Sequence, residues 1–204
     1  LGEYWYGYGT GYKNLIYVIC SEGIGSGIIA EGNILRGKNN VTGEFGHMSI
    51  NANGKKCSCG RYGCVEAYCS LDAIENMAKA ALKQGRKSQL LGLAQGDIDA
   101  IDYKLICEGA RGGDLLCNER LEEAACFLST GLANTIGIIN PELIILSGEL
   151  FDESDYFYDL VKEYTIGKLS NIAAQGIMFV NRKVKDNLYE IGAATLVYKS
   201  FFQD

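Results

Sequence analysis

The sequence predicts a mixed α/β fold, and three observations lead to this prediction. An apolar, β-branched run at 15–20 is followed by shorter apolar runs separated by glycines, a pattern typical of consecutive strands. Helical spacing of apolar residues then dominates from 72 to 136. After position 141, short apolar runs alternate with helical segments. Strands that first follow one another and then alternate with helices indicate a mixed α/β sheet.

The first strands are predicted to form a β-meander. Leu15–Cys20 is β-branched and aromatic, which is typical of a buried strand. Residues 21–27 contain three glycines and are predicted to turn the chain. Strands are expected to resume at 28–31 and to return at 34–36 after a second glycine turn. The tyrosine- and glycine-rich opening, 4–12, is expected to be a helix end and a surface loop.

Three helices are predicted in the middle of the chain. Asp72–Gln84 has apolar residues at helical spacing and is ended by Gly85. Ile101–Ala110 is a second candidate. The third helix is long, and Asp114 can cap its first turn. Its apolar stripe includes Leu115, Leu121, Ala125, Leu128, Leu132 and Ile136.

The last third of the chain is predicted to alternate strands and helices. Pro141, the only proline, precedes 143–146, a strand that is apolar on both faces. A helix near 155–165, a strand near 177–180 and a terminal helix from Gly192 complete the pattern. The 204 residues are enough to bury a core, and no internal repeat or flexible interdomain linker divides them.

Composition and charge exclude several classes of function for these residues. Hydrophobic residues make up 48% and charged residues 22%, as in ordinary soluble proteins. No apolar run approaches the ~20 residues that span a bilayer, and the first residues lack the features of a signal peptide. The net charge is -6, and no dense Lys/Arg cluster offers an electrostatic footprint for nucleic acid. Any DNA binding must therefore come from another segment.

Eight cysteines raise the question of disulfides. The even count permits them, but no export is expected from the first residues, and buried free cysteine behaves as a small hydrophobe. A reducing cytoplasm is therefore expected. Four cysteines in apolar segments are predicted to be core residues: Cys20, Cys107, Cys117 and Cys126. Cys69 is left open, and the remaining three lie close together in the sequence.

The only histidine lies near those three cysteines. His47 is followed by Cys57, Cys59 and Cys64 within eighteen residues. Zinc favours four nitrogen or sulfur ligands in a tetrahedron, so these residues are predicted to hold zinc. Four protein ligands leave no open position for water, and the zinc is therefore expected to be structural. Two alternatives stay open: thiols that bind no metal, and an all-cysteine site in which Cys69 replaces His47.

Several segments resemble the signature of the ROK family, which comprises repressors, uncharacterised reading frames and sugar kinases. The most specific match is Gly43-Glu-Phe-Gly-His47 followed by Cys57-x-Cys-Gly-x-x-Gly-Cys64-Val-Glu66. Further stretches agree at 23–29, 140–146 and 190–194, so that the match covers essentially the whole chain. The run 54–60 looks most like the xylose-responsive repressor branch of the family.

The resemblance implies an actin/hexokinase-like, ribonuclease-H-type fold of two lobes with a sugar in the cleft. Residues 1–204 would form the C-terminal lobe, with the zinc insert at about 43–66. The terminal helix, 192–202, would pack against the other lobe. The first phosphate motif of the family and its catalytic aspartate would lie before residue 1. The chain itself is therefore expected to hold no catalytic residue and no residue that binds a nucleotide cofactor.

The same resemblance implies that Glu44, His47 and Glu66 contact sugar hydroxyls. Carboxylates accept hydrogen bonds from vicinal hydroxyls, and an imidazole can use one nitrogen for zinc and the other for a ligand. For the two glutamates the alternative is support of neighbouring residues or a solvated helix start.

Two departures from the kinases of the family concern its nucleotide site. Glu22 stands where those kinases usually have threonine, in the hairpin that faces the nucleotide phosphates. Glu149 stands after Gly148, where the kinases prefer a glycine cluster near adenosine. A carboxylate at either place would repel phosphate in the absence of a metal ion. The departures favour a regulator over an enzyme.

The sequence therefore favours the effector-binding lobe of a ROK-type transcriptional regulator with a structural zinc. The expected partners are a monosaccharide effector, DNA through an N-terminal domain outside these residues, and a second copy of the chain in a dimer; no membrane is expected. The alternative is the C-terminal lobe of an ATP-dependent, glucokinase-like sugar kinase. A third possibility is a zinc-stabilised assembly module that binds no sugar.

Overall fold

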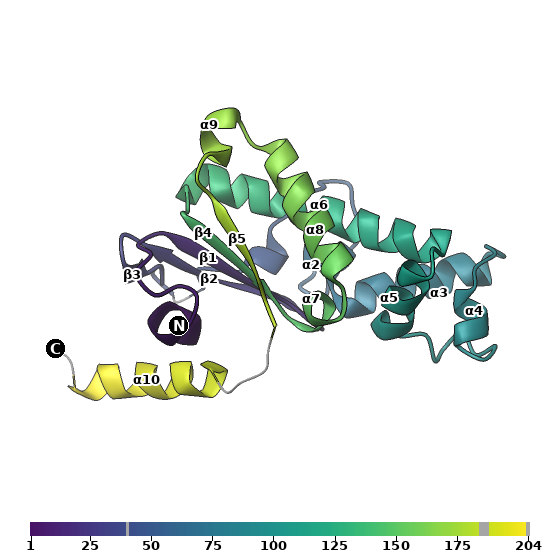
Figure 1. The fold of residues 1–204 in the computed structure, drawn as a ribbon, viewed down its shortest axis with the longest axis horizontal. Helices are drawn as coiled ribbons and strands as arrows, with labels where there is room; N and C mark the ends of the chain where they lie inside the picture. Colours follow the sequence, from purple (N-terminus) through teal and green to yellow (C-terminus); the bar gives the residue numbers. More distant parts are fainter. Residues whose placement is uncertain (40, 184–187, 203–204) are drawn as a thin grey trace.

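A five-stranded mixed sheet forms the centre of the protein (Figure 1). The computed structural model describes residues 1–39, 41–183 and 188–202. The strand order is β3-β2-β1-β4-β5; β1, β2 and β3 pair antiparallel, whereas β4 pairs parallel with both β1 and β5. The strands are β1 (Leu15–Cys20), β2 (Ile24–Ala30), β3 (Asn33–Ile34), β4 (Leu143–Ser147) and β5 (Met178–Arg182). The predicted mixed α/β sheet is confirmed.

The second strand begins earlier than predicted. β2 starts at Ile24 and includes the glycine-rich residues that were expected to form a turn. Gly25, Ser26 and Gly27 pair with residues of β1 along the ladder. Regular pairing with a buried neighbouring strand outweighs the weak strand preference of glycine. Only Ser21, Glu22 and Gly23 remain as the turn between the two strands.

The predicted helices are present, and several short ones accompany them. The helices are α1 (Gly2–Tyr6), α2 (Glu66–Cys69), α3 (Leu71–Lys83), α4 (Leu90–Leu93), α5 (Tyr103–Arg111), α6 (Leu115–Ile139), α7 (Glu149–Glu153), α8 (Asp155–Lys168), α9 (Asn171–Ala174) and α10 (Leu188–Phe202), with one 3₁₀ helix, η1 (Phe45–His47). A helix of four or five residues contains too few turns to show a hydrophobic period, which explains why α2, α4, α7 and α9 were not predicted.

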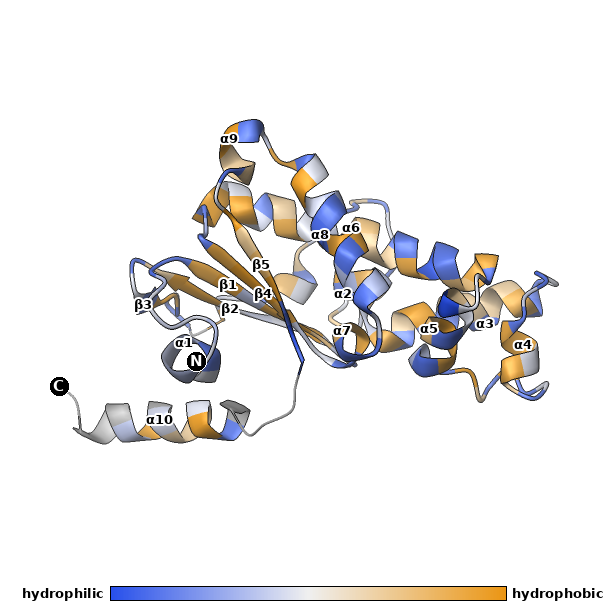
Figure 2. Ribbon diagram, in the orientation of Figure 1, coloured by the Kyte–Doolittle hydropathy of each residue, from blue (hydrophilic) through white to orange (hydrophobic). Residues whose placement is uncertain are grey.

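The long helix α6 covers one face of the sheet together with α8 (Figure 1). Asp114 caps it as predicted, because its side chain accepts a hydrogen bond from the backbone N–H of Cys117. The predicted apolar stripe is buried from Leu121 to Ile136, but Leu115 is 73% exposed. Leu115 begins the helix beyond the edge of the core, so its inclusion in the stripe was wrong. Figure 2 shows the matching apolar character of the strands beneath α6.

The opposite face of the sheet carries α1 and α10 (Figure 1). A second apolar cluster lies there, with Leu15, Ile29, Leu143 and Ile145 at its centre and Tyr4 of α1 packed against it. α1 also contacts α10. Within the described residues, no helix is long and apolar enough to cross a membrane.

The cysteines outside residues 57–64 are buried with one exception. Cys20, Cys69, Cys107 and Cys117 have at most 1% of their surface exposed. Cys126 is exposed, although it was predicted to be a core residue. It lies on α6 in an apolar stretch, but the helix turns its side chain away from the sheet because the neighbouring Ala124 and Ala125 occupy the buried side.

Candidate metal and sugar site

The Gly43–His47 segment is attached to strand β2 by two close backbone approaches. Gly43 has a φ of +93°, and a Cβ there would lie 2.5 Å from the carbonyl oxygen of Ser26. A Cβ on Gly46 would lie 2.2 Å from the carbonyl oxygen of Ile24. Both positions therefore require glycine. Between them Phe45 enters the core, and Glu44 and His47 are left at the surface of the segment, with their side chains 60% and 24% exposed.

The Cys-rich loop, residues 49–64, is a small hairpin closed by backbone hydrogen bonds. Gly63 N–H donates to Lys55 O (2.8 Å), and Cys57 N–H donates to Arg61 O (2.8 Å). Val65 N–H donates to Met48 O (3.0 Å), which brings the end of the loop back to the residue after His47. The tight return of the chain thus places Cys57, Cys59 and Cys64 beside the imidazole.

The structure brings all four predicted metal ligands together. One ligand atom from each of His47, Cys57, Cys59 and Cys64 lies within 4.8 Å of the others. The Sγ atoms of Cys59 and Cys64 are 3.7 Å apart, and Cys57 Sγ is 3.7 Å from His47 Nδ1. In tetrahedral zinc with Zn–S of about 2.3 Å and Zn–N of about 2.05 Å, these separations would be about 3.8 Å and about 3.6 Å. The donor set and its spacing fit zinc.

Cys69, the alternative fourth ligand, lies elsewhere. Its thiol donates to the carbonyl oxygen of Ala124 on α6 (3.2 Å), and the side chain is fully buried. Burial raises the pKa of the Cys69 thiol well above its ordinary value. A neutral thiol in an apolar core is a packing residue.

The pKa values of Cys64 and Cys59 are shifted in opposite directions. Burial, reinforced by hydrogen bonds with Cys59 and Cys57, raises the pKa of Cys64 to about 12. Hydrogen bonds from the backbone and side chain of Arg61 lower the pKa of Cys59 to about 6. Neighbouring thiols oppose ionising together, and a cation among them removes that opposition.

The two candidate sugar-binding glutamates lie on either side of His47. Glu44 Oε2 is 3.8 Å from His47 Nε2, and Glu66 Oε1 is 3.9 Å from His47 Nδ1. Glu66 is 18% exposed, and each of its oxygens already accepts a hydrogen bond from the chain: Ser58 Oγ donates to Oε1 (3.2 Å) and Ile24 N–H donates to Oε2 (3.1 Å). Ser58 and Ile24 were not predicted as partners of Glu66, because a hydroxyl and a backbone amide carry no distinctive motif.

The two glutamates that depart from the kinase pattern share one edge of the sheet. Gly148 has a φ of +110°, and a Cβ there would lie 2.1 Å from the carbonyl oxygen of Cys20, so that Glu149 begins α7 beside the end of β1. Burial, and next the Glu149 carboxylate, raise the pKa of Cys20 to about 12. Glu22 follows Cys20 by two residues, and both glutamates are exposed. The carboxyl ends of β1 and β4 thus carry two solvated carboxylates.

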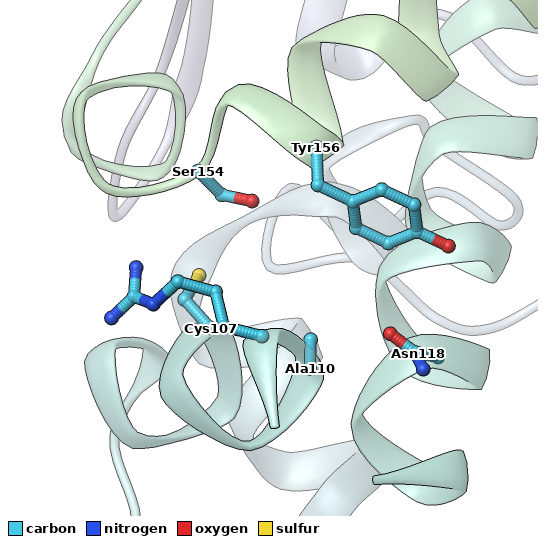
Figure 3. A pocket seen from close by; sticks show the side chains of 6 residues that line it. Cys107, Ala110, Asn118, Ser154 and Tyr156 are labelled. Atoms are coloured by element: carbon cyan, nitrogen blue, oxygen red, sulfur yellow. The ribbon is translucent and has the colours of Figure 1, made fainter. Parts of the chain in front are cut away.

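A separate cavity of about 330 Å³ lies between α5, α6 and the start of α8 (Figure 3). Figure 3 shows Ser154 and Tyr156 facing Cys107 and Ala110 across it. Arg111, which also lines it, is bound by Glu153, with Nη1 and Nη2 each 3.1 Å from Oε1. The cavity shares no residue with the metal cluster or with Glu44 and Glu66.

Comparison with known proteins identifies the family. The family model described as "ROK family" matches residues 1–200. The chain belongs to the ROK family. The ROK chain is 31% identical to the xylose repressor of Caldicellulosiruptor bescii and 28% identical to the glucokinase of Thermotoga maritima. Each alignment covers 97% of the chain, but 49% and 62% of the respective relatives. The chain thus spans about half to three fifths of the length of these relatives.

Solved ROK structures share the fold. A glucokinase from Streptomyces griseus, solved with glucose and AMPPNP, superposes with a TM-score of 0.84 at 30% identity, over 96% of this chain and 64% of that one. A ROK transcriptional regulator, a homologue of the Escherichia coli MLC protein, gives 0.75 at 26% identity, over 87% of this chain and 44% of that one. The actin-like sugar-kinase fold expected from the resemblance is confirmed. Repressors and kinases lie at similar identity, so family membership alone does not choose between them.

Proposed function

We propose that this chain is the C-terminal, effector-binding lobe of a ROK transcriptional regulator. The observation that carries the proposal is the position of Glu22 and Glu149 at the carboxyl ends of β1 and β4. Ligands of open α/β sheets bind at that edge, and a nucleotide there would bring its phosphates close to both carboxylates. The repulsion disfavours ATP at this edge.

His47, Cys57, Cys59 and Cys64 would hold zinc in this lobe. With four protein ligands the ion supplies no reaction chemistry; it fixes the loop between Met48 and Val65. Two of the ligands lie close in sequence to the candidate sugar-binding glutamates: Glu44 is three residues before His47, and Glu66 is two residues after Cys64. Fixing these ligands would therefore also fix the two glutamates. The metal site and the sugar site are therefore parts of one structure.

A monosaccharide would bind at Glu44, His47 and Glu66. The side chain of Glu44 is 60% exposed and can accept hydrogen bonds from sugar hydroxyls directly. His47 presents Nε2 on the side of Glu44, away from Cys57. A sugar hydroxyl that reaches Glu66 can donate to the second lone pair of an oxygen that already accepts from Ser58 or Ile24.

In the regulator, sugar binding would change DNA affinity through the relative position of two lobes. The effector acts only if it binds one arrangement more tightly than the other. DNA contact would come from an N-terminal domain, and the regulator would act as a dimer. The E. coli protein NagC, a DNA-binding transcriptional regulator, is 31% identical over 98% of this chain.

The proposal is tested on the full-length protein with ATP and each of glucose, xylose, N-acetylglucosamine and N-acetylmannosamine. We expect calorimetric binding of one of these sugars and no sugar-dependent release of ADP. The T. maritima glucokinase, assayed in parallel, is the positive control. ATP-dependent phosphorylation of any hexose would overturn the proposal, and absence of heat with every sugar would favour the zinc-stabilised assembly module.

The second candidate is the C-terminal lobe of a sugar kinase. The similarity to the S. griseus glucokinase, with a TM-score of 0.84, favours it. A kinase needs Mg-ATP and an aspartate base that positions the attacking hydroxyl. Titration of the full-length protein with AMPPNP separates the candidates, because the kinase would bind it in the presence of Mg²⁺ and sugar.

A further inference from the structure

Tyr68 connects the Cys-rich loop to the core without using any of the metal ligands. The residue lies on α2, two positions after Glu66, and is 4% exposed. Its ring stacks on Phe127 of α6, with ring centroids 3.9 Å apart and an angle of 23° between the planes. Because α6 is the central helix of the core, the Tyr68 ring has a fixed position.

The hydroxyl of Tyr68 holds the first half of the loop. It accepts hydrogen bonds from the backbone N–H of Lys55 (2.8 Å) and from Asn51 Nδ2 (3.3 Å). The Lys55 ammonium also lies over the ring, 5.0 Å from its centroid. These contacts end two residues before Cys57, the first cysteine of the cluster.

The local sequence is adapted to this contact at Gly54. A Cβ on Gly54 would lie 2.1 Å from the Tyr68 hydroxyl oxygen. Any other residue would therefore push the hydroxyl away from the Lys55 amide. The requirement comes from close packing, since φ at Gly54 is not positive: Tyr68 makes the closest approach, and Asn51 Cγ and O follow at 3.0 Å.

We propose that Tyr68 is a positioning residue that holds the 51–57 segment near its metal-bound geometry before the metal arrives. The inference rests on the proposed zinc site. A ligand loop that is already ordered loses less conformational entropy on binding, and the metal affinity rises accordingly. Residues behind metal ligands commonly change metal affinity by about 10–100-fold when they are replaced. The hydroxyl of Tyr68 acts in this way through the backbone rather than through a ligand side chain.

The test is the Tyr68→Phe variant of the chain, which keeps the stacked ring and removes only the hydroxyl. Tyr62→Phe is the matched control, because Tyr62 lies in the same loop and is 56% exposed. Zinc affinity is measured by competition with a chromophoric chelator, and thermal unfolding is measured with and without zinc. We expect Tyr68→Phe to bind zinc about tenfold more weakly than the unaltered chain. Tyr62→Phe should bind zinc with unchanged affinity. Hydrogen exchange of the Lys55 amide should be faster in the metal-free Tyr68→Phe variant.

A purely structural role would lower the unfolding temperature equally with and without zinc and leave zinc affinity unchanged; that outcome overturns the inference. If the unaltered chain binds neither zinc nor Co²⁺, the proposed metal site fails and takes the inference with it. If Tyr68→Phe does not fold, Gly54→Ala replaces it, because it keeps the hydroxyl and displaces it from the loop. Weaker zinc binding of Gly54→Ala supports the inference, and wild-type affinity contradicts it.

Discussion

The two ring nitrogens of His47 face different neighbours. Nδ1 lies 3.7 Å from Cys57 Sγ, and Nε2 lies 3.8 Å from a carboxylate oxygen of Glu44. One ring can therefore serve the metal cluster and the sugar site at the same time. Glu66 is different, because its oxygens receive hydrogen bonds from Ser58 and Ile24. Replacing His47 and replacing Glu66 should have separable effects.

We predict that His47→Ala lowers both zinc retention and sugar affinity, whereas Glu66→Ala lowers sugar affinity and leaves zinc bound. Loss of a hydrogen bond to a charged group costs about 1.5–3 kcal/mol, which corresponds to roughly 10–150-fold weaker sugar binding. Metal content after dialysis and calorimetry with the effector sugar measure the two effects. Equal loss of zinc in the two variants would show that Glu66 supports the metal cluster instead.

Single residues were predictable from the sequence where their chemistry is distinctive. His47 and the three cysteines were predicted as one cluster from ligand type and spacing, and the structure places them together. The position of Cys126 was wrong, because an apolar neighbourhood does not reveal which side of a helix a residue occupies. Tyr68 was not predicted as a partner of the loop, since the Lys55 amide that it holds is a feature of the folded backbone.

Helix α6 provides the surface on which both segments of the candidate site rest. A Cβ on Gly131 would lie 2.9 Å from the ring of Phe45 and 3.0 Å from Val65. Phe45 lies between Glu44 and His47, and Val65 immediately precedes Glu66. Glycine in a helix costs about 1 kcal/mol relative to alanine, so its presence at 131 reflects this close packing.

We predict that Gly131→Ala destabilises the protein by about 1–3 kcal/mol through overpacking and weakens sugar binding by displacing both segments. Gly137→Ala is the matched control on the same helix, since a Cβ there meets no atom within 4 Å. The control should raise the free energy of unfolding by about 0.5–1 kcal/mol. Urea unfolding measures both variants, and equal stabilisation by both would contradict the packing seen at Gly131.

Asp114 joins the start of α6 to the segment before α4. Its carboxylate accepts hydrogen bonds from the backbone N–H groups of Cys117 (3.0 Å) and Gln89 (2.6 Å) and from Ser88 Oγ (2.9 Å). Burial alone would raise the pKa of Asp114, but these hydrogen bonds outweigh it and hold the pKa below its ordinary value. A carboxyl with a lowered pKa in the folded state stabilises that state above its unfolded pKa.

We therefore predict that Asp114→Ala costs about 1–2 kcal/mol at pH 7, as expected for loss of a helix cap. The difference from the unaltered protein should be constant down to about pH 4, the ordinary pKa of aspartate, and should shrink as the pH falls through the lower folded-state pKa. Asp99→Ala is the control, because its side chain is 84% exposed. Thermal unfolding across this pH range checks the prediction, and a difference that does not depend on pH would contradict it.

Elements with a long, regular pattern were predictable, and those fixed by tertiary contacts were not. α6 follows from the helical spacing of its apolar residues and its Asp114 cap, and β4 follows from a continuous apolar run; β4 ends one residue later than predicted. The start of β2 was missed because pairing with β1, rather than glycine content, sets it. Short helices such as α7 form because the chain turns tightly at Gly148, and this turn depends on contact with β1.

The core of the molecule and the Cys-rich loop are stabilised by different means. The main apolar cluster joins the sheet to helices such as α3, α5, α6 and α8 and contains large, fully buried side chains such as Phe151 and Phe157. Between 51 and 62, by contrast, the chain is exposed except at Gly54 and Cys57. Little apolar surface holds that loop, so the order of its second half, 58–62, should depend on the metal while the core remains folded.

We predict that a zinc chelator makes the chain susceptible to trypsin at Arg61 without unfolding the core. Arg61 is exposed and lies beyond the 51–57 segment that Tyr68 holds. Lys104 is also exposed but belongs to α5, and it should stay uncut under the same conditions. Mass spectrometry of the fragments and circular dichroism check the two parts. Cleavage throughout the chain would mean that the metal supports the whole fold.

The single tryptophan lies on the other side of the sheet from this loop. Trp5 belongs to α1, which packs against α10 (Figure 1). Its ring centroid is 6.5 Å from that of Tyr4. Tryptophan emission therefore reports on the environment of the α1–α10 pair and is insensitive to events confined to the metal cluster. A change of emission on adding sugar would mean that the effect of binding has crossed the sheet, which makes Trp5 a natural optical probe of long-range communication in this chain.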